Sequence, residues 1–321
     1  MENPGLSPLV AARAGALAYY SPYYFLRQFA TERQQDLFGT GAAARWGQGA
    51  GETTLQGQLP AATAKVEVHW LLRQLAWDSE YFGTSTYRLF TGLFATHITT
   101  SELVRAAEEL RQELTARGAF YAFSVVPAED VALLQALTGS GWRLVETRLT
   151  YYRDQLAAFD YPPHPVRLAT AAEGPVLGAV AAHARNPYDR FHADPWFGAA
   201  RADAYLACYA ENAVAAGLAD AVLVPDLPGQ APDSFLAISD LTTDARALGV
   251  GLSRVLLTAV GPANRGWHVK LLAETVRRAQ AAGHEAVLMT TQATNHAVFR
   301  SCEKLGFRLG GTSHVLACHS S

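Results

Sequence analysis

The stretch TAVGPANRGWHVKLLAE, residues 258–274, is the best starting point for interpreting this chain. An apolar strand pattern runs into a Val-Gly-Pro turn at 260–262, and an Asn-Arg-Gly turn at 264–266 leads into a helical pattern. Backbone N–H groups at a helix N-terminus bind phosphate well, because they lack partners within the helix and the helix dipole favours negative charge there. The stretch therefore predicts a loop that holds a phosphate group. Trp267 and His268 depart from the pattern, because such loops usually have small residues at these positions.

Strands and helices alternate on both sides of this loop. Continuous apolar runs predict buried strands, and apolar residues at helical spacing predict helices. The expected strands are 166–170, 221–224, 235–241, 255–260 and 284–291, and the expected helices are 173–185, 199–216 and 268–282. Asn295 is a good N-cap for a further helix that ends near Gly306, and a closing strand follows it. Residues 186–197 are expected to form a loop, and three prolines at 162–165 predict a domain boundary at about 155–164.

The first half of the chain repeats the end of this series. Gly118 and Gly141 are as far apart in sequence as Gly283 and Gly306, so one constant shift along the chain superposes the two pairs. Equal element lengths indicate equal packing, so the sequence predicts two halves that share a helix–strand–helix–strand unit. Only the second copy has an Arg-Gly loop before its helix, and only this copy is expected to hold a phosphate in this way.

The N-terminal region has a different composition. Residues 39–64 are rich in Gly, Ala, Gln and Thr, which predicts a loop or mobile arm after a helical segment at 8–37. The aromatic cluster at 19–25 is expected to pack this extension onto the body of the protein. The predicted parts are a helical extension with a flexible loop at 1–64, an N-terminal domain at 65–158 and a C-terminal domain at 159–321.

The composition restricts the classes of partner. The chain has 321 residues, 50% of them hydrophobic, and a net charge of −3, so neither nucleic acid nor an anionic membrane is an expected partner. No apolar run approaches the length of a membrane-spanning helix, and the N-terminus lacks the pattern of a signal peptide. Cys208, Cys302 and Cys318 form no CxxC pair, which argues against a disulfide framework or a metal site. We expect a cytoplasmic protein without a bound metal.

Two passages, together with the order of elements around them, carry a family resemblance. VGPANRGWHVKLL (260–272) is similar to the acyl-CoA motif V-x-P-x-x-R-G-x-G with its following helix. TTQATNHAVFRSCEKLGF (290–307) is similar to the motif N-x-x-A-x-x-L-Y-E-K-x-G-F. The chain from about residue 166 onward therefore resembles the GCN5-related N-acetyltransferase (GNAT) superfamily. The resemblance implies an α/β fold in which helices flank a mixed central sheet, preceded here by an incomplete GNAT-like half.

The resemblance implies acetyl-CoA as co-substrate. The strand before the loop would pair its backbone with the amides of pantetheine, and the loop and the following helix N-terminus would hold the pyrophosphate. A backbone N–H near the end of this strand would polarise the thioester carbonyl, as an oxyanion hole does. The residues implied in cofactor binding are Thr258, Ala259, Val260, Arg265, Gly266, Trp267, His268, Val269, Lys270, Asn295 and Ser301.

Two residues depart from the family pattern. His268 stands at the second glycine of the acyl-CoA motif, where its side chain either gives a donor to the phosphate, obstructs it or points to solvent. Cys302 stands where the family has a tyrosine that acts as general acid. A thiol with a pKa near 8.5 can protonate a leaving thiolate, but a cysteine on a helix can also be a small buried hydrophobe. Ser301 or water would then be the proton donor.

Within the superfamily, two passages resemble TDP-4-amino-sugar N-acetyltransferases of the TDP-fucosamine type. LAWDSEYFGTSTYRL (75–89) is similar to their W-D-S-x-F-F-G passage, and NPYDRFHADPWF (186–197) to their R-F-H-x-D-x-x-F passage. Aromatic side chains of the second passage can stack on a sugar, while His192 or Asp194 accepts a proton or orients an amine. The alternative is an ordered loop anchored by its aromatics, in which Asp194 caps the following helix. The segment 1–60 has no counterpart in that family.

The sequence thus predicts an N-acyltransferase that moves an acetyl group from acetyl-CoA to a small amine, such as a nucleotide-linked amino sugar. Direct attack in a ternary complex is expected, with Cys302, His192 and Asp194 as the candidate catalytic residues. Two alternatives stay open. One is an N-acyltransferase for a peptide or protein amine, and the other is a GNAT-fold binding protein that has lost catalysis, which His268 and Cys302 favour. The first half of the chain either forms a homodimer contact or helps to close the acceptor site.

Overall fold

The computed structural model of the protein describes residues 6–59 and 66–320. The chain divides into two compact units, of which unit 1 contains Met1–Thr147 and Thr312–Ser321, and unit 2 contains Arg148–Gly311. The division falls inside two strands, β5 (Arg143–Arg153) and β11 (Arg308–His319), so each strand gives one part to each unit. The prolines near residue 162 suggested a division after β5, whereas the structure divides within it.

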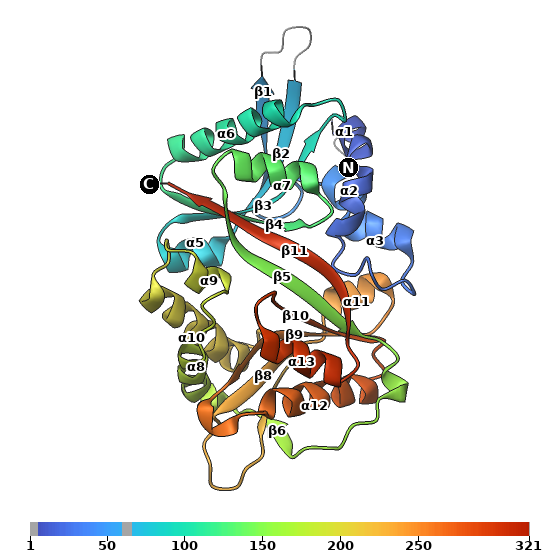
Figure 1. The fold of residues 1–321 in the computed structure, drawn as a ribbon, viewed down its shortest axis with the longest axis vertical. Coiled ribbons are helices and arrows are strands. Elements are labelled where there is room, and N and C mark those ends of the chain that lie inside the picture. The colour runs from blue at the N-terminus through green and yellow to red at the C-terminus, as the bar shows by residue number, and fades with distance from the viewer. Residues whose placement is uncertain (1–5, 60–65, 321) are drawn as a thin grey trace. The chain divides into compact units, whose positions relative to one another are not determined.

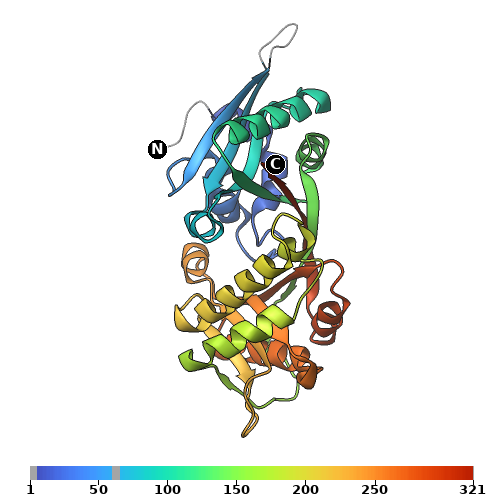
Figure 2. The same ribbon diagram turned by 90° about the vertical axis from the view of Figure 1, so that its left-hand side faces the viewer.

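Unit 1 is a sheet covered by helices on both faces (Figures 1 and 2). Its helices are α1 (Ser7–Ala12), α2 (Ala14–Leu17), α3 (Thr31–Phe38), α4 (Thr40–Ala44), α5 (Ala76–Phe82), α6 (Thr100–Ala116) and α7 (Val131–Gly139). Its strands are β1 (Glu52–Leu59), β2 (Val66–Gln74), β3 (Ser85–Phe94), β4 (Phe120–Pro127) and the parts of β5 and β11. The strand order is β1-β2-β3-β4-β11, and of these described pairs only β3 and β4 run parallel.

Neighbouring residues of β2 show why helices must cover both faces of the sheet in unit 1. Leu72 packs in one apolar cluster with residues of α6 and α7, such as Leu110 and Leu133. Leu71 packs in another cluster with residues of α1, α2 and α4, such as Val10. Successive side chains of a strand point to opposite faces, so a strand that is apolar at consecutive positions must be buried on both sides.

Unit 2 has the same kind of layers. Its helices are α8 (Gly174–His183), α9 (Arg190–Ala193), α10 (Ala199–Ala215), α11 (Thr242–Leu248), α12 (Trp267–Ala281) and α13 (His296–Lys304). Its further strands are β6 (Val166–Leu168), β7 (Ala221–Pro225), β8 (Ser234–Ser239), β9 (Leu252–Val260) and β10 (Ala286–Gln292). The order is β5-β10-β9-β8-β7-β6, and of these described pairs only β10 and β9 run parallel. Leu236 of β8 packs toward α12 and α13, and Phe235 packs toward α8 and α10 on the other face (Figures 1 and 2).

The two units repeat the same elements at a nearly constant shift along the chain. α7 and α13 have equal lengths, and their starts differ by the same shift as the two glycine pairs in the sequence. The starts of α5 and α11 differ by one position more. β3 and β9 share a bulge one residue after their last parallel pairing, at Phe90 and Leu256 respectively. The repeat predicted from the sequence is therefore present, and it extends further toward the N-terminus than expected, since α1, α2 and α4 cover the face that α8 and α10 cover in unit 2.

The final strands of the two halves are exchanged. β5 ends the first half of the sequence, yet its residues 148–153 pair with β10 in unit 2. β11 ends the second half, yet its residues 313–319 pair with β4 in unit 1. Each unit therefore contains the larger part of the last strand of the other half of the sequence.

One expectation for the N-terminal region was wrong. The sequence predicted a loop at 39–64, but the structure has α4 and the strand β1 within 39–59, and residues 60–64 lie outside the described residues. β1 is a polar edge strand that pairs with β2, and Leu55 is its one buried large apolar side chain among residues 52–57. Edge strands rich in polar residues resemble loops in composition, which explains the error.

Among residues 6–59 and 66–320, no helix is long and apolar enough to cross a membrane. Within the same ranges, no three His, Cys, Asp or Glu side chains form a group that could hold a metal ion.

Candidate functional site

The candidate site in unit 2 begins where β9 and β10 separate. These strands pair in parallel only from Leu252 to Val255 of β9, against Ala286–Met289 of β10. β9 continues to Val260 and stays paired with β8 along its other edge. Among the described strands, none pairs with the β10-facing edge of β9 after Val255, so the peptide groups there are free to pair with a ligand.

A cavity of about 560 Å³ lies at this separation. Its lining comes from the end of β9, the start of α12, the segment before and within α13, and the segment after α8. The lining residues are Ala184, Arg185, Asn186, Pro187, Tyr188, Thr258, Ala259, Val260, His268, Thr294, Asn295, His296, Ala297 and Val298. These described lining residues include no carboxylate and one permanently charged side chain, Arg185.

The N-terminus of α12 lacks a side-chain cap. Its N-cap is Gly266, which adopts a left-handed backbone conformation with φ of 89°, and no described side chain caps the first turn. The matching helix of unit 1, α6, has a complete capping box, in which Thr99 accepts from the N–H of Glu102 and the Glu102 carboxylate accepts from the N–H of Thr99 at 2.9 Å. The first-turn N–H groups of α12 are thus available to an anion, whereas α6 already has a carboxylate at that place.

The residues predicted to bind the cofactor fall into three groups. Thr258, Ala259, Val260, His268 and Asn295 line the cavity, and Asn295 also caps α13 by accepting from the N–H of Val298 at 3.3 Å. Arg265 and Gly266 are exposed in the loop before α12. The others have structural contacts: Trp267 and Val269 pack in the core, Lys270 lies 4.5 Å above the Trp267 ring, and Ser301 donates to the carbonyl of Ala297 at 3.0 Å.

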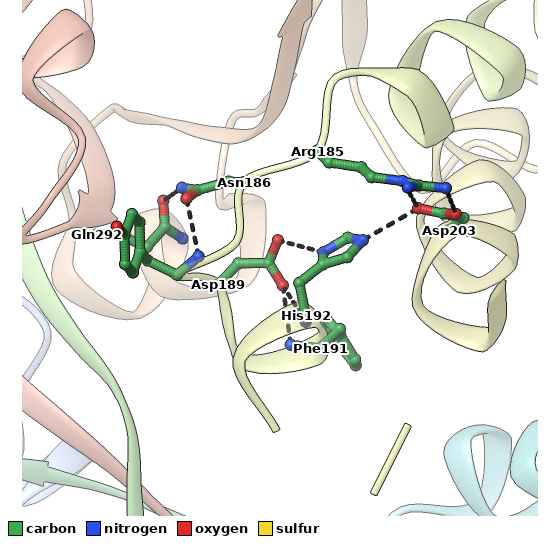
Figure 3. A network of polar contacts seen from close by, with 8 residues as sticks. Arg185, Asn186, Asp189, Phe191, His192, Asp203 and Gln292 are labelled. Carbon is green, nitrogen blue, oxygen red and sulfur yellow. Dashed lines mark hydrogen bonds and ion pairs between the residues drawn. The ribbon is translucent and has the colours of Figure 1, made fainter. Parts of the chain in front are cut away.

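A hydrogen bond beside the cavity joins two segments that are far apart in sequence. The amide of Asn186 donates to the side-chain carbonyl of Gln292, at the end of β10, at 2.6 Å (Figure 3). This bond ties the segment after α8 to the strand that leaves β9. Tyr188 is 56% exposed and stands two positions further on, at the edge of the cavity.

The side chain of His192 is held between two carboxylates (Figure 3). Its Nδ1 lies 2.7 Å from Asp189 Oδ2, and its Nε2 lies 3.1 Å from Asp203 Oδ1. Burial opposes protonation of this ring, but the hydrogen bonds to Asp203 and Asp189 outweigh it and raise the pKa of His192. Both ring nitrogens are thus engaged, and His192 does not line the cavity. The contacts fit a role in joining α9 to α10, where Asp203 also pairs with Arg185.

His192 should make stability depend on pH. Because its pKa in the folded protein is raised above the value of about 6.5 in unfolded chains, the stabilisation is complete below pH 6.5 and is lost as the pH rises through the folded value. We expect His192→Gln to lower the free energy of unfolding by about 1 kcal/mol at pH 5.5, and by less at pH 8.5. Urea unfolding at both values measures this. His183→Gln, at an exposed histidine of α8, is the control for the loss of an imidazole as such.

The other two predicted catalytic residues are buried away from the cavity. Asp194 is 1% exposed and accepts from the N–H of Trp196 at 3.1 Å. It does not cap the following helix as the ordered-loop alternative expected, because Trp196 precedes α10 and the N-cap of α10 is Gly198, without a side-chain cap. Cys302 is fully buried in the core beneath α13, at the position that Leu137 occupies in α7 of unit 1. Burial, together with the nearby Glu303 carboxylate, raises the pKa of the Cys302 thiol to about 12.

Several residues that line the cavity were not identified from the sequence. Arg185 was considered only as the end of a helix, and Asn186 begins a passage in which only the aromatics, His192 and Asp194 were given a role. His296 was considered only as part of a helix. These residues share a position in the fold, because each lies next to a helix end beside the point where β9 and β10 separate. The sequence alone does not show that these helix ends and strands meet.

The corresponding strand edge of unit 1 is covered by the chain itself. Aligned on the shared bulge, Gly92 of β3 corresponds to Thr258 of β9. The Nε of Arg13 donates to the carbonyl of Gly92 at 3.2 Å, and its guanidinium lies 4.2 Å from the centre of the Phe94 ring. Arg13 also forms an ion pair with Asp130, the counterpart of Asn295. The N-terminal segment thus fills the region that is a cavity in unit 2.

Comparison with known proteins identifies a fold. No protein-family model and no curated protein matches the sequence. A GCN5-related N-acetyltransferase from Sphaerobacter thermophilus has 12% identity and a TM-score of 0.52, over 99% of this chain and 93% of that chain. The GCN5-related glucosamine N-acetyltransferase region of a fungal multi-domain β-N-acetylglucosaminidase has 12% identity and a TM-score of 0.57, over 98% of this chain and 37% of that chain.

At this identity the likeness shows the fold alone. The chain has the fold of the GNAT superfamily, with a mixed sheet flanked by helices, and the likeness extends over nearly its whole length. The fold class predicted from the sequence is confirmed.

Proposed function

We propose that this chain, which has the GNAT fold, is an N-acyltransferase that takes an acetyl group from acetyl-CoA. The observation that carries the proposal is the uncapped N-terminus of α12, placed beside the unpaired edge of β9 within unit 2. An uncapped helix start suits a pyrophosphate, and a free strand edge suits the amides of a pantetheine arm. Unit 1 supports the assignment by contrast, because α6 is capped by its own carboxylate and β3 is covered by Arg13.

The reaction would be a direct acyl transfer. A neutral amine attacks the thioester carbonyl, a peptide N–H at the end of β9 stabilises the oxyanion, and the C–S bond breaks to release the CoA thiolate. The amine loses a proton and the thiolate gains one, so the reaction balances without a further reactant. A thiolate with a pKa near that of cysteine leaves readily, and water in the open cavity can exchange both protons.

Cys302 is not required as a general acid in this scheme. Its buried thiol, with a pKa of about 12, donates a proton poorly to a thiolate of lower pKa. We expect Cys302→Ala to keep the turnover number within about twofold while lowering the free energy of unfolding by about 1–2 kcal/mol, because a buried thiol is replaced by a smaller group. Steady-state release of CoA and urea unfolding measure the two effects. A loss of turnover of about 100-fold in a folded variant would show that Cys302 takes part in catalysis.

The lining favours an acceptor with little positive charge besides its amine. The described lining residues include no carboxylate, so a polyamine would meet no counter-charge in the lining itself. A phosphate group would meet the exposed guanidinium of Arg185, which also pairs with Asp203. We therefore propose a nucleotide-linked amino sugar as acceptor, with Tyr188 available for stacking on a ring. A fungal region named for glucosamine N-acetylation shares the fold, which makes an amino sugar a sensible first substrate class to test.

Two experiments test the proposal. Calorimetry should show binding of acetyl-CoA in the micromolar range, and the absence of binding at high protein concentration would exclude both transferase alternatives. Release of thiol should then be measured with nucleotide-linked amino sugars, glucosamine, polyamines and peptides. Fastest release with the nucleotide-linked sugars supports the proposed acceptor, and fastest release with peptides would favour a peptide or protein amine. Binding without turnover on any acceptor would favour a protein that has lost catalysis.

A further inference from the structure

The two ring nitrogens of the half-buried His268 are buried polar atoms that the described part of the chain leaves without a partner. His268 is the second residue of α12, and neither of its ring nitrogens, Nδ1 or Nε2, has a hydrogen-bond partner among the described residues or access to solvent. A buried polar group left in this state costs about 1–3 kcal/mol, and native proteins rarely keep one without a reason. A bound ligand that completes the hydrogen bonds is such a reason.

The position of His268 indicates which part of a ligand it would meet. The residue lines the same cavity as Thr258–Val260 and Asn295, at the open edge of β9. Arg265 and Gly266, which belong to the loop before α12, are exposed and do not line the cavity. The loop and the imidazole therefore contact two different regions, one at the exposed start of the helix and the other inside the cavity.

The charge state of His268 indicates which chemical group of a ligand the imidazole would bind. No Asp or Glu is among the described residues that line the cavity, and burial lowers the pKa of His268 to about 4. The ring is thus neutral near pH 7, with one nitrogen that donates and one that accepts. A neutral imidazole brings no charge to a phosphate, but it matches an amide, which also has one donor and one acceptor. Acyl-CoA has its amides in the pantetheine arm and its phosphates at the nucleotide end.

We propose that His268 binds the pantetheine arm of acyl-CoA through a hydrogen bond to an amide group and does not contact the pyrophosphate. This inference rests on the proposed function, because it requires acyl-CoA as the ligand. His268 would then be a binding residue. Its side chain would contact the ligand at a position where the family motif has a glycine, which lets the backbone approach closely.

Calorimetry with two ligands and two kinds of substitution tests the inference. CoA contains the arm, and adenosine 3′-phosphate 5′-diphosphate contains the same nucleotide and both 5′-phosphates without the arm. His268→Phe fills a similar volume without a hydrogen bond, and His268→Gln keeps a donor and an acceptor. We expect His268→Phe to weaken CoA binding about tenfold, which corresponds to one net hydrogen bond, and to change binding of the nucleotide by less than about twofold. His268→Gln should keep CoA binding within about threefold of the original.

Each other outcome contradicts the inference. Equal weakening of both ligands by His268→Phe would place the imidazole at the phosphates. Unchanged or tighter CoA binding by both His268→Phe and His268→Gly would mean that the ring only fills space. If the unmodified protein bound neither ligand, the proposed function would fail and the inference with it. If the unmodified protein bound CoA but His268→Phe did not selectively weaken that binding, only the inference would fail. Thermal unfolding checks that each variant is folded, and His268→Leu replaces His268→Phe if the larger ring prevents folding.

Discussion

Replacing Asp130 by alanine should lower the free energy of unfolding by about 3–5 kcal/mol. The Asp130 carboxylate is 1% exposed, and it pairs with the buried guanidinium of Arg13 and accepts from the hydroxyl of Tyr20 at 2.7 Å. It also caps α7 by accepting from the N–H of Leu133 at 3.3 Å. The variant would leave a buried cation without its counter-charge, which is more costly than the loss of a cap. Urea unfolding followed by circular dichroism measures the change.

The chain contains a matched control for this prediction. Asn295 caps α13 in the same way, with its Oδ1 3.3 Å from the N–H of Val298, but its side chain is uncharged and forms no ion pair. Asn295→Ala should therefore cost about 1 kcal/mol, the usual value of a helix cap. Equal losses in Asp130→Ala and Asn295→Ala would show that the ion pair with Arg13 adds nothing, and would contradict the prediction.

The second large effect is expected at Gly266. Gly266→Asp places a carboxylate at the uncapped start of α12, where we propose that the pyrophosphate binds. Two like charges about 4 Å apart repel by up to about 4 kcal/mol in a partly solvated site, so acetyl-CoA should bind at least about 30-fold more weakly. Calorimetry with acetyl-CoA is the measurement.

Gly266→Asn is the neutral control for this substitution. Both side chains have the same size, both enter open space, and both bear the cost of a φ of 89°, which asparagine and aspartate tolerate better than most residues. Gly266→Asn should weaken binding by no more than about threefold. A loss of similar size in the two variants would mean that backbone strain, rather than charge, causes it, and would argue against a phosphate at this helix start.

The elements that local patterns specify could be predicted from the sequence. Asn295 was identified as a cap and α13 as a helix ending near Gly306, because capping residues and a left-handed glycine act within a few residues of their own position. The shift between the halves was visible for the same reason, since α7 and α13 repeat a short, regular pattern. The polar strand β1 was missed, because pairing with β2 overrides its loop-like composition.

The site was predictable only in part, because its chemistry depends on partners far apart in sequence. Cys302 occupies a tyrosine position in the motif, but the packing around α13 makes it the equivalent of a core leucine. His192 was predicted to accept a proton or orient an amine, but Asp203, in the next helix, occupies its second ring nitrogen. The strand end at Thr258–Val260 lines the cavity, because β9 leads directly into the loop that the motif identifies. The roles of these residues stay predictions until the variants are measured.

The exchange of β5 and β11 bears on how the protein can be divided for expression. A chain cut between residues 158 and 159 would separate β4 from β11, and β10 from β5. Most residues of β4 and β10 are buried, and each strand would gain an unpaired edge. Such edges pair readily with other chains, so separately produced halves would be prone to aggregate, and the two halves are best treated as one cooperative folding entity.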